Sequence, residues 1–99
     1  MSEKTQQDRA VEAYYAGCEH MPKATSEHGD ALVVAIWNNE QDLREAKASE
    51  NQARKAHDIE WYRQAHAEAI RAFDNMTGAT KELAALVRDH NHRTAGEES

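Results

Sequence analysis

Apolar and small side chains recur at alternating steps of three and four along the second half of the chain. Such spacing keeps a stripe on one side of an α-helix. An earlier series, Leu32, Ile36, Leu43 and Ala46, has the same helical phase. Both series predict amphipathic helices. The main stripe, predicted to line the core or an oligomer contact, comprises Ile59, Tyr62, His66, Ala69, Phe73, Met76, Thr80, Leu83 and Val87, with Ile36 and Leu43 as its counterparts upstream.

Residues 30–77 contain neither Gly nor Pro, the residues that most often end helices. Helices are predicted over 26–48 and 51–77, with a slip in the apolar pattern between them. A tight turn near Ser49 would explain the slip, because Ser49 and Gln52 match a capping box. An unbroken helix whose stripe rotates at a stutter would explain it as well. We favour the turn, and therefore a helical hairpin.

Shorter elements flank this hairpin. A helix is predicted over 3–16 because Val11, Tyr14 and Cys18 share one face, and Gly17 suits its end. The segment 17–25 holds the only Pro and is predicted to be a loop. Gly78 is expected to stop a helix and Thr80 to start the last one, 80–90. Residues 91–99 are predicted to be a mobile tail.

The composition provides few large apolar side chains for a core. Of the 99 residues 39% are hydrophobic, but 18 of these are Ala and only 12 residues are Leu, Ile, Val or Phe. A chain with so few bulky aliphatic residues gains from self-association. The prediction is an all-α domain over 1–90, in which a short N-terminal helix and long helices form a hairpin, bundle or coiled coil completed by homo-oligomerisation.

Charge excludes several partners. The chain has 18 acidic and 12 basic residues, a net charge of −6, and the signs alternate along its middle. No basic patch favours nucleic-acid binding. No apolar run approaches the roughly 20 residues of a membrane helix. One Cys and no signal-like segment predict a cytoplasmic protein.

Catalytic and metal-binding patterns are missing from the sequence. Cys18, Glu19 and His20 are adjacent, but catalytic partners meet in space and not by adjacency. The six His form no pair with the helical spacing of metal ligands at a convincing place. We therefore predict no catalytic residues, no metal and no cofactor.

Aromatic residues and the polar loop remain as candidate binding features. Tyr and Trp are enriched at binding hot spots. The predicted binding residues are Tyr14, Tyr15, His20, Lys23, Thr25, Trp61 and Arg63. The expected function is a non-enzymatic helical interaction module that self-associates and binds or inhibits a partner protein. The alternative is an oligomeric protein that sequesters a small anionic metabolite or nucleotide.

Overall fold

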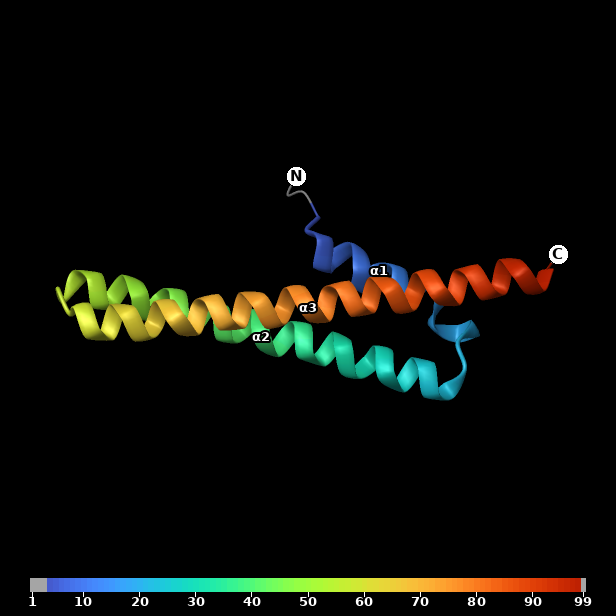
Figure 1. Ribbon diagram of the computed structural model, residues 1–99, viewed down its shortest axis with the longest axis horizontal. Coiled ribbons are helices and arrows are strands. Elements are labelled where there is room, and N and C mark those ends of the chain that lie inside the picture. Colours follow the sequence, from blue (N-terminus) through green and yellow to red (C-terminus); the bar gives the residue numbers. More distant parts are fainter. Residues whose placement is uncertain (1–3, 99) are drawn as a thin grey trace.

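A computed structural model describes residues 4–98 and shows an all-helical chain. Helix α1 spans Gln6–Gly17, a short 3₁₀ turn η1 spans Cys18–His20, α2 spans Lys23–Lys55 and α3 spans Ile59–Glu98. Helices α2 and α3 run antiparallel as a long hairpin, and α1 packs beside α3 near the open end of that hairpin (Figure 1). The molecule measures 63 × 31 × 16 Å. The helical hairpin is thus present, while no second copy is part of the structure.

The hairpin turns later than the sequence predicted. Helix α2 continues through Ser49, which lies in its interior, and the chain reverses at residues 56–58. His57 adopts a left-handed φ of 56°. The amide of Asp58 donates to the Ala53 carbonyl at 3.0 Å and that of His57 to the Arg54 carbonyl at 3.1 Å. This pattern is the Schellman ending of a helix, here without the usual Gly.

Asp58 caps the start of α3. Its carboxylate accepts a hydrogen bond of 3.0 Å from the Trp61 amide, as an N-capping residue does. The capping box predicted at Ser49 was therefore wrong. The true turn was missed because α2 ends at a His in the left-handed region, where Gly or Asn would be the usual residue.

Helix α3 also passes two predicted boundaries. Gly78 is exposed within the helix, and the Thr80 hydroxyl donates to the Met76 carbonyl at 2.8 Å instead of capping a new helix. The backbone stays helical through Glu98, where a tail was predicted, and Ser99 lies outside the described residues. A single exposed Gly lowers helix stability by about 1 kcal/mol, which a helix packed along its length tolerates.

The N-terminal segment agrees more closely with its prediction. Thr5 caps α1 in a capping box with Asp8, and the described part of the predicted helix 3–16 is helical from Gln6. The predicted loop 17–25 is shorter than expected, because η1 follows α1 and α2 already begins at Lys23, after Pro22. Proline at a helix start leaves no hydrogen bond unmade, since the first amides of a helix have no partner within it.

The seam, defined as the α3 residues that face α2, repeats every seven residues. Its members are buried or half-buried: Tyr62, Ala65, Ala69, Ala72, Met76, Ala79, Leu83, Leu86 and His90. A seven-residue repeat is typical of helices that pack as a coiled coil. Four residues of the predicted stripe, Tyr62, Ala69, Met76 and Leu83, belong to the seam.

The other stripe residues form a row beside the seam. Ile59, His66, Phe73, Thr80 and Val87 follow one another at intervals of seven. Ile59 is 67% exposed and Phe73 is 53% exposed, and His66 is exposed as well. The seam uses Ala65 and Ala72 in place of their larger neighbours, because small side chains let two helices approach closely. Whether Ile59, His66 and Phe73 meet a second copy remains a prediction.

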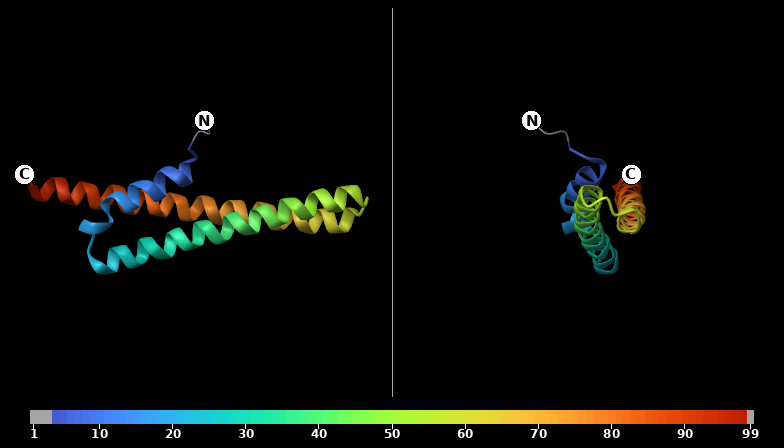
Figure 2. Two further views of the ribbon diagram at one scale, coloured as in Figure 1. Left: turned by 180° about the vertical axis from the view of Figure 1, so that it is seen from behind. Right: turned by 90° about the vertical axis from the view of Figure 1, so that its left-hand side faces the viewer.

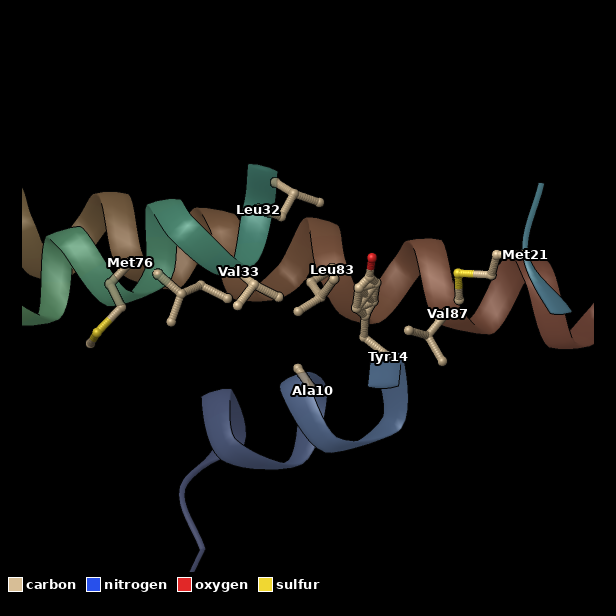
Figure 3. Packing of buried hydrophobic residues seen from close by; sticks show 9 residues of the cluster. Ala10, Tyr14, Met21, Leu32, Val33, Met76, Leu83 and Val87 are labelled. Atoms are coloured by element: carbon tan, nitrogen blue, oxygen red, sulfur yellow. The ribbon is translucent and has the colours of Figure 1, made fainter. Parts of the chain in front are cut away.

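Larger side chains gather where the third helix is present. Tyr14, Val33, Ile36 and Leu83 are the largest fully buried side chains. Figure 3 shows the Tyr14 ring rising from α1 between Leu83 and Val87 of α3. In the end-on view of Figure 2, α1 projects to one side of the α2–α3 pair. Near the turn, by contrast, the buried residues are alanines: Ala46, Ala53, Ala65, Ala69 and Ala72.

Candidate interaction surface

Tyr14 anchors helix α1 to one side of the hairpin. This residue is fully buried, and its hydroxyl lies 2.6 Å from Asp30 Oδ1 and 2.7 Å from the Ser26 carbonyl oxygen. Burial, together with the hydrogen bond to Asp30, raises the pKa of Tyr14 above its usual value. The hydroxyl therefore stays protonated at neutral pH and serves as a donor.

Gly29 makes room for this ring. A Cβ atom at position 29 would lie 2.5 Å from Tyr14 Cε2, closer than any real contact allows. Here Gly is needed for close approach and not for backbone freedom. Tyr14, one of the predicted binding residues, thus joins α1 to α2 inside the protein.

The side of the hairpin that α1 covers continues beyond α1 toward the turn. On α3, Val87 and Thr80 lie beneath α1, and Phe73, His66 and Ile59 extend the same row. Residues at intervals of seven stay on one side of a packed helix pair. The row therefore leads from a covered region to an uncovered one.

A parallel set of rows completes the uncovered region. On α2, Val33 is buried near α1, and the residues that follow it at intervals of seven are Glu40, Lys47 and Arg54. A second row on α2 starts at Asp30 and continues, at the same interval, with Trp37 and Arg44. On α3, Ala84 borders α1, and the residues that precede it at intervals of seven are Thr77, Ile70 and Arg63. We call the uncovered part the open face: Trp37, Glu40, Arg44, Lys47, Asn51, Arg54, Ile59, Arg63, His66, Ile70, Phe73 and Thr77.

Four large apolar side chains on the open face are half exposed or more. The exposed fractions are 53% for Trp37, 67% for Ile59, 50% for Ile70 and 53% for Phe73. Scattered single apolar residues are ordinary on protein surfaces, whereas an aligned series marks an interaction site. Ile59 and Phe73 share one row of α3, Ile70 lies on the adjacent row, and Trp37 lies on α2.

The open face is also basic. The open face carries four cations, Arg44, Lys47, Arg54 and Arg63. Two carboxylates oppose them: Glu40, which accepts a 2.8 Å hydrogen bond from Arg44, and the half-buried Glu50, which contacts His66 of this face. Lys47 and Arg63 form no ion pair with any described residue. The chain as a whole carries a net charge of −6, so this side of the hairpin has the opposite sign to the average.

Near the turn, a ladder of polar contacts joins the two helices. The guanidinium carbon of Arg54 lies 6.0 Å from the centroid of the Tyr62 ring, and that ring stacks on His66 with centroids 5.8 Å apart. His66 Nδ1 in turn lies 3.1 Å from Glu50 Oε1. A hollow of about 360 Å³ lies at this end, lined by Ala53, Arg54, His57, Asp58, Ile59 and Tyr62.

The opposite side of the hairpin has a different character. We define this opposite face by Asp42, Glu45, Ser49, Trp61, Glu68, Arg71 and Asn75. Most of these residues line a shallow polar hollow between α2 and α3. Trp61 is the large aromatic residue at its end and is 37% exposed. The opposite face therefore carries more carboxylates than cations and no aligned apolar row.

The remaining predicted binding residues are spread over the molecule. His20 and Thr25 line a hollow of about 540 Å³ between the start of α2 and the end of α3, together with His28, Glu82, Asp89 and Arg93. Tyr15 is half exposed on α1, and the Lys23 ammonium lies 3.9 Å from Glu27. Arg63 is on the open face, at the far end of the hairpin from these residues. Among the predicted binding residues, the structure places His20 and Thr25 in one hollow and holds the ring centroids of Tyr14 and Tyr15 5.3 Å apart.

Sequence reasoning missed most of the open face. Trp37, Lys47, Arg54 and Ile70 were not selected. The signal that would have found them is the seven-residue repeat counted outward from the alanine positions. Large apolar residues drew attention away from Ala65 and Ala72, which form the actual contact.

The structure was also compared with the requirements of a metal site and of a membrane-spanning helix. No group of three or more His, Cys, Asp or Glu among the described residues is arranged to hold a metal ion. Within residues 4–98, no helix has the length and apolarity to cross a membrane. Comparison with protein-family models, curated proteins and solved structures gives no match.

Proposed function

We propose that this chain is a non-catalytic helical interaction protein that receives a helix on its open face, from another protein or from a second copy of itself. One observation supports this proposal above the others. The side of the hairpin that α1 covers continues for several helical turns toward the hairpin turn, and there no further helix of the described residues lies over its apolar rows. A site that already binds one helix has the shape to bind another.

The energetics agree with helix docking. Complete burial of an Ile or Phe side chain is worth about 1.5–3 kcal/mol, so a half-exposed one can still contribute roughly 1 kcal/mol. Trp37, Ile59, Ile70 and Phe73 together supply the apolar anchors that helix-in-groove recognition requires. The surrounding cations supply a charged rim.

Photo-crosslinking tests this proposal. A benzoylphenylalanine placed at Phe73 probes the open face, and one at Asn75, two residues away on α3, probes the opposite face. Purified protein and host-cell extract are each irradiated, and adducts are identified by mass spectrometry. We expect a defined protein adduct from position 73 that position 75 does not give. Equal adducts from both positions, or none, would contradict the proposal.

A second candidate is sequestration of a small ligand in the 540 Å³ hollow. Its volume falls in the range of ligand pockets, and His20, Thr25, His28 and Arg93 offer polar contacts to an anion. Glu82 and Asp89 line the same hollow and oppose an anion there. A thermal-shift screen with nucleotides tests this candidate, and a rise in melting temperature that Arg93→Ala abolishes would support it.

A further inference from the structure

We infer that the occupant of the open face is an amphipathic helix whose apolar stripe is flanked by Asp or Glu. This inference rests on the proposed function and adds the chemistry of the partner. It follows from three features of the open face: its apolar rows, its charge and its length.

The apolar rows define the stripe of the incoming helix. Phe73 and Ile59 lie on one row of α3, and Ile70 lies on the adjacent row. Helix α1 meets the covered end of the same rows with Ala10 and Tyr14, which are four residues apart and both buried. An incoming helix with apolar residues at alternating steps of three and four would meet the uncovered end in the same way.

The charge defines the flanks. Lys47 and Arg63 have no ion-pair partner among the described residues, and they lie on different helices. Arg54, whose described contact is with the Tyr62 ring, lies on the same row as Lys47. A docked helix would therefore have cations along both of its edges. Carboxylates at those edges would form ion pairs, whereas Lys or Arg would be repelled.

The charge also argues against a second copy on this face. In a two-fold dimer each patch meets itself, so Lys47, Arg54 and Arg63 would meet the same cations of the other protomer. The opposite face of a second copy supplies the carboxylates Asp42, Glu45 and Glu68 but lacks an aligned apolar row to cover Phe73. Neither contact with a second copy, open face to open face or open face to opposite face, would both pair the cations and cover the apolar rows.

The length sets the size of the partner helix. From Ile59 to Phe73 the open face covers about 21 Å of α3 at 1.5 Å per residue. An incoming helix of roughly 14–18 residues would span this distance. Helix α1, with 12 residues, is a similar length.

Peptide binding to the intact chain tests the inference. Three 18-residue peptides share one scaffold: one has a Leu/Ala stripe with Glu at the flanks, one has the same stripe with Lys at the flanks, and one has Glu flanks with Ser in place of the stripe. Binding is measured by titration into ¹⁵N-labelled protein, and the shifted amides locate the contact. We expect the acidic amphipathic peptide to bind at least tenfold more tightly than the basic one, and the Ser peptide not to bind.

Variants on each face sharpen the test. Lys47→Glu with Arg63→Glu should lower the affinity for the acidic peptide at least tenfold and raise it for the basic peptide. Phe73→Ser with Ile70→Ser should abolish binding of both, and circular dichroism would confirm that these exposed positions leave the fold intact. Arg71→Glu, a charge reversal on the opposite face, is the matched control and should leave the affinity within twofold of the parent.

The outcomes separate the inference from the proposed function. Tighter binding of the basic peptide at the open face would overturn the acidic partner and keep the proposed function. Binding of no peptide, with dimerisation that Phe73→Ser abolishes in sedimentation experiments, would assign the face to a second copy. Binding of no peptide and no dimerisation, but Phe73-dependent sedimentation with anionic phosphatidylserine vesicles, would assign it to a membrane surface and overturn both.

Discussion

The two ends of the hairpin bury their contacts by different means. At the open end, three helices enclose large side chains, among them Tyr14, Ile36 and Leu83. At the turn end, two helices meet through alanines such as Ala53 and Ala65. Bulky residues fill the wider space that a third helix creates, whereas alanines bring two helices together and leave their larger neighbours outside. The difference explains why Ile59, Ile70 and Phe73 stay exposed near the turn.

Truncating the core at the three-helix end should have the largest effect. Leu83 is fully buried between the helices, so Leu83→Ala removes buried methyl groups and leaves a cavity. The expected loss of unfolding free energy is about 3 kcal/mol, within the 2–5 kcal/mol range for such changes. Urea denaturation followed by circular dichroism measures it. Leu86→Ala, at a half-buried position, should cost less, and an equal loss would show that the core is not centred on Leu83.

Enlarging the alanine contact should be the next most damaging change. Ala72→Leu inserts a bulky side chain at a buried position between α2 and α3, and overpacking of this kind costs about 1–3 kcal/mol. The damage should stay at the turn end, so amide exchange should quicken near residues 46 and 72 more than near Tyr14. The matched control is Ala67→Leu, on the exposed side of α3, which should be close to neutral. Equal losses from the two variants would refute close packing at Ala72.

Replacement of two glycines by alanine should have opposite signs. Gly29→Ala pushes a Cβ into the Tyr14 ring, and we expect a loss of about 1–2 kcal/mol together with faster amide exchange in α1. Gly78→Ala meets no atom within 4 Å. It should gain about 1 kcal/mol, because Ala favours a helix interior. Melting curves of both variants decide the matter, and the same sign for both would contradict the packing of α1 on α2.

The smallest expected change lies at the hairpin turn. His57 holds a left-handed φ of 56°, which costs an L-residue roughly 1 kcal/mol and Gly almost nothing. His57→Gly should therefore stabilise the protein by about 0.5 kcal/mol after the extra freedom of the unfolded chain is counted. Thermal unfolding measures the gain. A loss above 1 kcal/mol would indicate that the His57 side chain contributes to the hollow beside it.

The sequence correctly predicted the all-helical class and those seam residues that belong to the apolar stripe, such as Met76 and Leu83. It failed at His57, because a Schellman ending without Gly has no composition signal. It failed at Gly78, because packing along α3 outweighs the local cost of Gly. The seam at Ala65 and Ala72 was assigned one residue too late, since hydrophobicity alone favours the larger neighbour.

The candidate surface was harder to find than the fold. Tyr14 was chosen for its ring, and that ring is fully buried beside Gly29 and Asp30. Lys47 and Arg54 looked like ordinary solvated charges, because only the position of α1 shows which side of the hairpin they share. A sequence pattern gives the spacing of residues along a helix but not which side its neighbour covers.

Trp37 and Trp61 lie on different sides of the hairpin, one on the open face and one on the opposite face. The protein consequently carries an intrinsic optical reporter for each side, with no dye required. In Trp61→Phe the remaining indole is Trp37, and its emission should shift toward the blue when a partner helix covers the open face. In Trp37→Phe the remaining indole is Trp61, and its emission should not change. Such a pair of single-tryptophan proteins distinguishes the two surfaces in a cuvette.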